Sequence, residues 1–160
     1  MEFVINEWYL DWHRPDTSLE NQEMARKFLN WLLASEHRIV LLRGSPFHQK
    51  LNDYRRRFDY YHMCRIYLKL FISQIFEDPA KCRILEYAPP LSSEIVAFLQ
   101  RPVAPPLTNF ESDRYLFESA EATREKTIVT TDDKLMLHFA NNGHFYLMSV
   151  EDFFSNYNIL

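Results

Sequence analysis

The sequence predicts an α/β fold in which a mostly parallel sheet is covered by helices on both faces, giving three layers. Short apolar runs alternate along the chain with longer segments of helical periodicity. A strand that is followed by a helix and then by another strand usually joins parallel neighbours in one sheet. The chain has 160 residues, of which 47% are apolar, so we expect a single domain over residues 1–160 with one buried core.

The first half of the chain is expected to contain two strands and the helices that follow them. The apolar runs Glu2–Ile5 and Arg38–Leu42 are the expected strands. Thr17 precedes Glu20 at the spacing of a capping box, which predicts the start of the helix between these strands. A further helix is expected near Pro46. The longest apolar stripe follows and is interpreted as core; it consists of Tyr60, Cys64, Tyr67, Leu68, Phe71, Ile72 and Ile75.

The second half of the chain is expected to add three strands, at Cys82–Tyr87, Thr127–Thr130 and Tyr146–Met148. Helices are expected over Ser92–Leu99, from Ser112 onward, from Asp132 to about Asn141, and after Ser149, which is placed to cap the last one. The segment Arg101–Thr108 contains three prolines and is expected to be a loop.

Composition excludes several classes of function. The net charge of −4 argues against nucleic-acid binding through bulk charge. The only glycines, Gly44 and Gly143, are isolated, which argues against a glycine-rich phosphate loop. The cysteines, Cys64 and Cys82, lack the spacing of a zinc site or a disulfide framework, so a reducing, cytoplasmic setting is expected. No apolar run is long enough for a membrane span, and no membrane partner is expected.

Two aspartates are the strongest candidates for chemistry. Asp113 stands at the start of an expected helix, and Asp132 follows the expected strand Thr127–Thr130. Ligands of open α/β sheets collect outside the carboxyl ends of strands. If the helix packs back along the strand, the two carboxylates converge, and they then need a cation between them or a proton on one of them. The alternative is that each aspartate only caps a helix.

The motifs around these aspartates resemble those of the PIN-domain family of metal-dependent nucleases. Asp113-Arg114-Tyr115-Leu116 with Ala120 is similar to the D-x-x-L-x-x-x-A helix of that family. Ile128-Val129-Thr130-Thr131-Asp132 is similar to its later strand and T-x-D motif, and Met148–Phe154 to its closing strand and helix. The resemblance implies a PIN-like fold, a Mg²⁺ or Mn²⁺ ion held by Asp113 and Asp132, and cleavage of RNA.

The sequence departs from the family pattern at two acidic positions. Asn6 stands where the first aspartate belongs, and Lys50 falls near the expected glutamate. Asn6 offers a neutral oxygen to a metal, and Glu7 replaces the missing carboxylate if the strand end bulges by one residue. Lys50 inside the site would argue for a pocket without metal. The expected catalytic set is therefore Asp113 and Asp132 with Asn6 or Glu7.

Basic residues outside the acidic motifs supply a candidate RNA contact. Arg55, Arg56 and Arg57 are flanked by aromatic residues, a pattern suited to phosphates and stacked bases, and Lys50 lies nearby in sequence. A solvated helix surface is the alternative. Two functions remain open: a ribonuclease, which the resemblance associates with an antitoxin protein in toxin–antitoxin modules, and an inactive PIN-like module that binds RNA or protein. A homodimer is also expected as a possible assembly.

Overall fold

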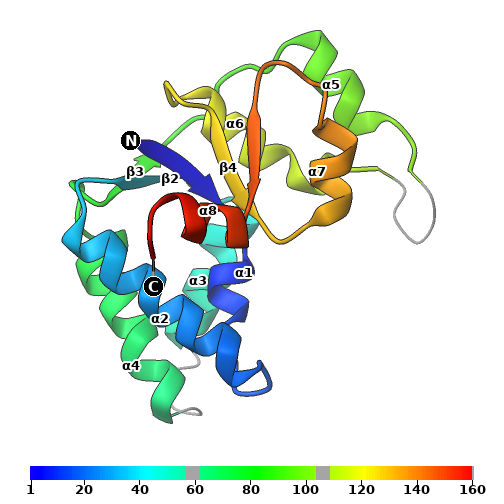
Figure 1. Ribbon diagram of the computed structural model, residues 1–160. Coiled ribbons are helices and arrows are strands. Elements are labelled where there is room, and N and C mark those ends of the chain that lie inside the picture. Colours follow the sequence, from blue (N-terminus) through cyan, green and yellow to red (C-terminus); the bar gives the residue numbers. More distant parts are fainter. Residues whose placement is uncertain (57–61, 104–108, 160) are drawn as a thin grey trace.

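Figure 1 shows the computed structural model, which describes residues 1–56, 62–103 and 109–159, and of residues 62–65 the backbone alone. Its described part contains a sheet of five strands, all parallel, in the order β3-β2-β1-β4-β5. The strands are β1 (Glu2–Ile5), β2 (Arg38–Leu42), β3 (Cys82–Leu85), β4 (Thr127–Thr130) and β5 (Tyr146–Ser149). The predicted three-layer α/β fold is confirmed, and the sheet is more uniform than the mostly parallel one expected.

The helices form a layer on each face of the sheet (Figure 1). Phe153 packs 6.2 Å from Phe28 between ring centroids and so holds the last helix on the same face as the second. That layer contains α1 (Trp8–Asp11), α2 (Leu19–Ala34), α3 (Pro46–Arg56), α4 (His62–Phe71) with its π-helical extension Ile72–Phe76, and α8 (Val150–Asn156). The opposite layer contains α5 (Ser93–Gln100), a 3₁₀ turn (Glu111–Asp113), α6 (Arg114–Glu121) and α7 (Asp133–Phe139).

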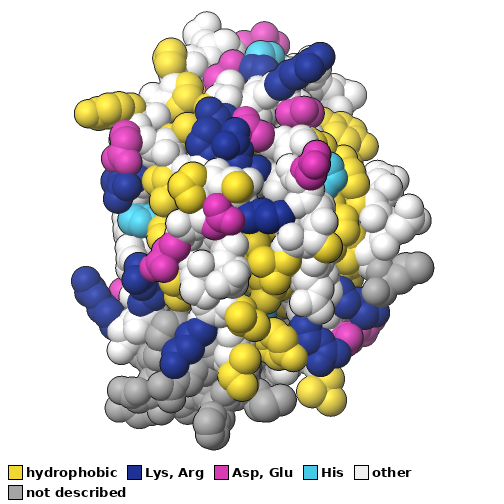
Figure 2. All heavy atoms as spheres, turned by 90° about the vertical axis from the view of Figure 1, so that its left-hand side faces the viewer, with side chains coloured by type: hydrophobic (Ala, Val, Ile, Leu, Met, Phe, Trp, Pro, Cys, Tyr) yellow, Lys and Arg dark blue, Asp and Glu magenta, His cyan; other side chains and the backbone are white. Residues whose placement is uncertain are grey.

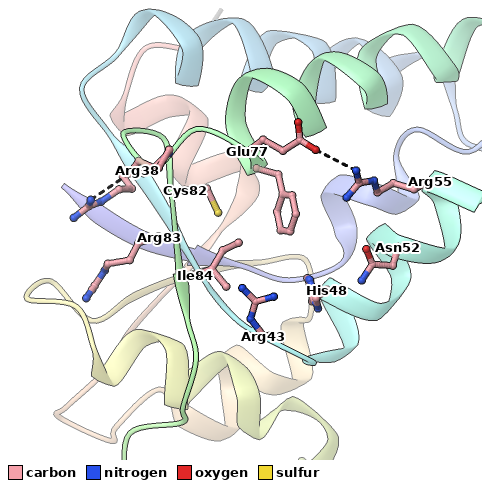
Figure 3. Close-up of a pocket in the computed structure, with 11 residues that line it drawn as sticks. Arg38, Arg43, His48, Asn52, Arg55, Glu77, Cys82, Arg83 and Ile84 are labelled. Carbon is pink, nitrogen blue, oxygen red and sulfur yellow. Dashed lines mark hydrogen bonds and ion pairs between the residues drawn. The ribbon is translucent and has the colours of Figure 1, made fainter.

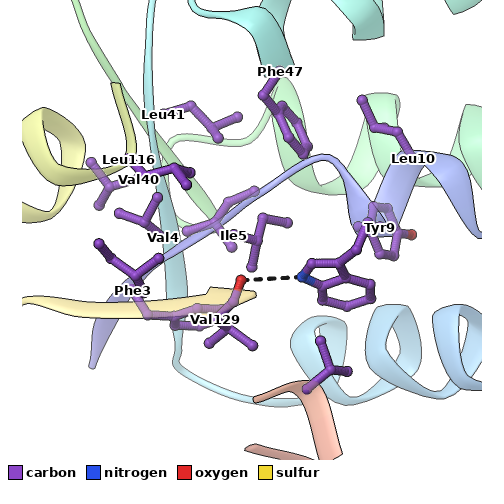
Figure 4. Close-up of a cluster of buried hydrophobic side chains, with 14 of the residues drawn as sticks. Phe3, Val4, Ile5, Tyr9, Leu10, Val40, Leu41, Phe47, Leu116 and Val129 are labelled. Atoms are coloured by element: carbon purple, nitrogen blue, oxygen red, sulfur yellow. Dashed lines mark hydrogen bonds between the residues drawn. The ribbon is translucent and has the colours of Figure 1, made fainter. Parts of the chain in front are cut away.

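The core lies between these layers and is widest around β1. Phe3, Val4 and Ile5 are fully buried, as expected for a central strand with helices on both faces (Figure 4). On the second face, Phe117 of α6 packs 4.3 Å from Phe139 of α7. Trp8 also ties α1 to β4, because its indole N–H donates to the Val129 carbonyl oxygen at 3.2 Å. The segment after β1 is thereby fixed against the end of β4.

Most of the expected helix starts are found, with one correction. Ser149 caps α8 as predicted, since its hydroxyl accepts the Asp152 amide at 3.0 Å. The predicted capping box at Thr17 is wrong: Ser18 accepts the Asn21 amide at 3.1 Å instead. The Thr17 hydroxyl instead donates to the Asp11 carbonyl oxygen at 2.8 Å and closes the turn between α1 and α2, and the helix starts one residue later.

Some element ends differ from the expected ones. β3 ends at Leu85, two residues before the predicted end at Tyr87, and the Tyr87 side chain is 88% exposed. α7 ends at Phe139, before the predicted Asn141, and the chain then turns through Gly143 at a φ of +67°. A left-handed residue there is tolerated because glycine has no Cβ. None of the helices in the described ranges combines the length and apolar character needed to cross a bilayer.

Candidate functional site

The candidate site lies at the carboxyl ends of the two central strands. β1 and β4 are hydrogen-bonded neighbours, with Ile5 paired to Val129. Because both strands run in the same direction, the residues that follow each of them emerge side by side. The Thr130 hydroxyl oxygen joins the two ends, since it accepts the Asn6 side-chain amide at 2.9 Å and the Asp132 backbone N–H at 3.1 Å. Thr130 is fully buried, so this connection is shielded from water.

Asp132 has a structural role as well as its place in the candidate site. Its carboxylate Oδ1 accepts the backbone N–H of Leu135 at 2.9 Å and so caps α7. A carboxylate at this position satisfies a free amide of the first turn and faces the positive end of the helix dipole. The helix-cap interpretation is therefore confirmed for Asp132. The cap uses Oδ1 and leaves the second carboxylate oxygen, Oδ2, for other contacts.

Asp113 does not behave in the same way. It precedes the first turn of α6, but its side chain makes no capping hydrogen bond there, so the helix-cap interpretation is wrong for Asp113. The Ser112 hydroxyl donates to Asp113 Oδ2 at 3.3 Å. The pKa of Asp113 is raised to about 6, first by burial and then by the negative charges of Asp132 and Glu7. The three carboxylates thus share one electrostatic environment.

Glu7 joins this group through a contact that the sequence did not reveal. The Tyr115 phenol donates to Glu7 Oε2 at 2.7 Å. Tyr115 is buried in α6, which packs across β1, β2 and β4. No sequence signal pairs residue 7 with residue 115, because the contact depends on how α6 lies over the sheet. Tyr115 is consequently a site residue that sequence reasoning missed, although it lies within the D-x-x-L motif.

Asn6 and Lys50 are the two residues expected from the sequence to stand in place of acids. The Asn6 side chain donates to Thr130, which orients its amide nitrogen toward β4, and its oxygen accepts the Trp8 backbone N–H at 3.4 Å. Lys50 lies in α3 and pairs with Asp11 of α1 at 2.5 Å between Nζ and Oδ1. This ion pair engages the ammonium group of Lys50. The pKa of Asp113 is shifted by burial and by Asp132, Glu7 and Ser112, so Lys50 does not neutralise Asp113.

The basic cluster is only partly described. Arg55 lies in the last turn of α3 and pairs with Glu77 at 3.1 Å. Arg56 is exposed at the end of the same helix. Arg57 and the aromatic residues that follow it at 58, 60 and 61 lie outside the described residues. Arg55 lines a pocket away from the acidic residues, which is described below.

The donor chemistry of the acidic site suits a hard divalent cation. Mg²⁺ takes oxygen ligands and is commonly held by one or two carboxylates, with waters and substrate phosphates completing its shell. Asp113 and Asp132 provide two such carboxylates. Among the side chains that the structure describes, those of residues 1–56, 66–103 and 109–159, no three His, Cys, Asp or Glu groups are close enough together to hold a metal ion. The residues therefore fit an open two-carboxylate site and do not form a closed cage.

The comparisons with known proteins found no relative of this chain. No protein-family model, curated protein or solved structure gives a significant match to the chain. The similarity to the PIN-domain family stays a prediction. It depends on the motif residues around Asp113 and Asp132 and on the parallel sheet that brings them together.

Proposed function

We propose that this protein is a divalent-metal-dependent endoribonuclease whose acidic site consists of Glu7, Asp113 and Asp132. One observation carries the proposal: the carboxylates of Glu7 and Asp132, which follow the ends of two adjacent strands, both raise the pKa of the Asp113 carboxyl. Carboxylates that repel one another cost stability unless a cation or a proton relieves the repulsion. Ligands of open α/β proteins bind outside the carboxyl ends of the strands, where these carboxylates lie.

The residues of the site take distinct parts in this proposal. Asp113 and Asp132 would hold the cation, which when bound neutralises charge on the scissile phosphate and lowers the pKa of an attacking water. Tyr115 fixes Oε2 of Glu7, so Oε1 is the oxygen that remains to accept the proton of that water. Thr130 keeps the ends of β1 and β4 together through Asn6 and Asp132, which preserves the spacing of the carboxylates.

The second candidate function is a PIN-like module that binds RNA or a protein partner without cleaving it. Asn6 in place of an aspartate and Lys50 in place of a glutamate favour it, because each substitution removes a negative charge from the family's ligand set. Such a module would use the same end of the sheet. It would not require a metal ion for its stability.

The resemblance also suggests a biological setting. The cysteine pattern, which lacks a disulfide framework, favours a reducing, cytoplasmic setting for such a ribonuclease. Toxin–antitoxin pairing would supply a small antitoxin protein as its inhibitor, and a homodimer is a further possible assembly. These partners follow from the family resemblance and from no contact in this chain.

Cleavage of a fluorophore–quencher RNA in the presence of Mn²⁺ tests the enzymatic proposal. Asp113→Asn, Asp132→Asn and Glu7→Gln should each lower the rate about a hundredfold, the scale seen when metal sites are perturbed. Asp133→Asn is the matched control, because Asp133 is exposed in the first turn of α7 beside Asp132. Rates that are unchanged in all three site variants would rule out the assignment.

A binding measurement separates the two candidate functions. Mn²⁺ that binds the folded protein should raise the melting temperature of the wild type, and the rise should be smaller for Asp113→Asn. The non-enzymatic module predicts no such rise and no Mn²⁺-dependent cleavage, while RNA binding in EDTA persists.

A further inference from the structure

A second charged region lies at the β3 edge of the sheet, on the side shown in Figure 2. There an open pocket of about 740 Å³ is bounded by β2, β3, α3 and the end of the π-helical extension (Figure 3). We call it the arginine pocket, after its basic lining residues Arg38, Arg43, His48, Arg55 and Arg83. Asn52 and Phe76 add an amide and an aromatic ring to the lining. The pocket is separate from the three carboxylates of the acidic site.

Two arginines of the lining are already engaged with the protein. Glu2 pairs with both Arg38 and Arg83, and the contact from Arg83 measures 2.6 Å. Arg83 also donates to the Ala122 carbonyl oxygen at 2.7 Å, which directs its guanidinium group toward the end of α6. The cations that remain for a ligand of the pocket are therefore those of its other half.

The other half of the arginine pocket has exposed ion pairs. Arg43 donates to both oxygens of Glu86, at 2.7 and 2.8 Å, and the side chains are 52% and 57% exposed. Arg55 and Glu77 form a pair at 3.1 Å with exposures of 45% and 51%. Solvent-exposed ion pairs contribute little to stability. A phosphodiester presents two non-bridging oxygens that can accept two N–H groups of one guanidinium, and it can therefore replace either carboxylate on its arginine.

The pKa of His48 responds to the positive charge in the pocket. Burial lowers the pKa of His48, and the positive charges of Arg43 and Arg55 lower it further. The ring accepts the Gly44 backbone N–H at Nδ1, at 3.1 Å, and stacks against Phe76 at 5.7 Å. His48 therefore stays neutral near pH 7. It offers a flat surface beside two guanidinium groups.

Arg43 lies at the same end of the sheet as the acidic site, one strand away from β1. Arg43 follows the last residue of β2, and β2 is the neighbour of β1, whose end leads to Glu7. Beyond β3, Tyr87 comes directly after Glu86 and is 88% exposed. Exposed aromatic rings beside basic groups are the platforms on which unpaired bases stack. A strand that leaves the acidic site across the end of β2 would meet Arg43 first and Tyr87 next.

We infer that the arginine pocket binds the phosphodiester backbone of single-stranded RNA that extends from the acidic site, with Tyr87 stacking on one of its bases. The choice of RNA as the ligand rests on the proposed function. The binding itself needs neither a metal ion nor cleavage. Arg43 and Arg55 exchange Glu86 and Glu77 for phosphates when the RNA binds.

Fluorescence anisotropy of a labelled oligouridine of about ten nucleotides, measured in EDTA over a series of salt concentrations, tests this inference. The double variant Arg43→Ala with Arg55→Ala should bind about tenfold more weakly and should reduce the salt slope by about two. Tyr87→Ala should weaken binding without changing the salt slope. Arg124→Ala is the matched control, because Arg124 is exposed in the turn before the amino end of β4.

Arg43→Lys provides a second variant that preserves the charge. It should keep the salt slope and lose affinity, because lysine cannot make the bidentate contact. The inference is overturned if the double variant, folded by circular dichroism, binds the RNA with the affinity and salt slope of Arg124→Ala.

The outcome also separates this inference from the proposed function. RNA binding that depends on Arg43 and Arg55, in a wild type that shows no Mn²⁺-dependent cleavage, supports the pocket and rejects the enzyme. Cleavage that depends on Asp113, in a protein whose RNA binding ignores Arg43 and Arg55, supports the enzyme and rejects the pocket.

Discussion

The acidic site and the arginine pocket differ in how the fold treats their charges. In the arginine pocket, Arg43 and Arg55 each pair with one carboxylate, those of Glu86 and Glu77, and these pairs are about half exposed. In the acidic site, the negative charges of Asp132 and Glu7 act on the half-buried Asp113, whose pKa is raised to about 6. Charge at the sheet edge is thus balanced within the protein. Charge at the central strands is left for an external cation or proton to balance.

The difference follows from where each region lies in the sheet. Edge residues are surrounded by solvent and by long, flexible side chains that can reach a partner. The central strands are flanked by buried apolar side chains such as Ile5 and Val129, which offer no opposite charge. A ligand that brings its own charge therefore stabilises the centre more than the edge.

The largest effect on stability is expected at His13. This buried histidine lies outside both charged regions and shows what burial does to a single basic group. His13 is 5% exposed, and burial lowers its pKa from 6.5 to about 4. The unfolded chain therefore binds this proton more readily than the folded protein, and stability is lost as the pH falls through that range. The loss amounts to about 3 kcal/mol.

Urea unfolding of the wild type and of His13→Phe between pH 7 and 4 measures this contribution, with the phenyl ring keeping the packing against Tyr9. Carboxylates titrate in the same range in both proteins, so the difference between the two slopes isolates His13. Parallel slopes would show that burial does not control the charge of this group.

The next largest effect is expected at Asp113, where the comparison predicts a gain. Asp113→Asn removes the repulsion from Asp132 and Glu7 without removing a capping hydrogen bond. The free energy of unfolding at pH 7.5 should rise by about 1–2 kcal/mol, allowing for solvent screening of a partly exposed carboxyl. Denaturant unfolding in EDTA measures it, with Asp133→Asn as the control. A loss of stability would mean that Asp113 is compensated within the protein.

Asp132→Ala tests the cap of α7. The change removes the hydrogen bond from the Leu135 amide, which should cost about 1 kcal/mol of unfolding free energy. Asp132→Asn is the control, because it keeps a capping oxygen and relieves the same repulsion of Asp113. Equal stabilities of the two variants in denaturant unfolding would show that the cap does not contribute.

The smallest effect is expected at the sheet edge. Arg43→Ala breaks the exposed pair with Glu86, and the free energy of unfolding should stay within experimental error. Denaturant unfolding at low and high salt checks this, because a contributing pair would weaken at high salt. A clear loss would break the comparison, since the edge would then depend on its charges as the centre does.

Much of the fold was predictable from local patterns. β1, β2 and β4 begin and end at the residues expected from their apolar runs, because central strands are buried on both faces and need continuous apolar residues. The end of β3 was misplaced by two residues, since an edge strand has weaker constraints on its length. The cap of α2 was assigned to Thr17 instead of Ser18, because both residues carry a hydroxyl and only the fold shows that Thr17 closes the preceding turn onto Asp11.

The candidate site was predictable only in part. Asp113 and Asp132 could be singled out because Asp113 stands at the recognisable start of a helix and Asp132 follows the recognisable end of a strand. The contact of Tyr115 with Glu7 and the pairing of Lys50 with Asp11 could not, since they join residues of separate elements. Glu2 joining Arg38 to Arg83 is likewise a property of three neighbouring strands.

The amino-acid sequence by itself determined the order of strands and helices and the placing of aspartates at their ends, because these depend on periodicity and on the chemistry of neighbouring residues. The tertiary structure alone decided which charges meet. Parallel pairing of β1 with β4 brings Glu7 to Asp113 and Asp132, and the packing of α1 against α3 takes Lys50 to Asp11. Electrostatic interactions depend on distance and burial, and both are set only when the elements pack.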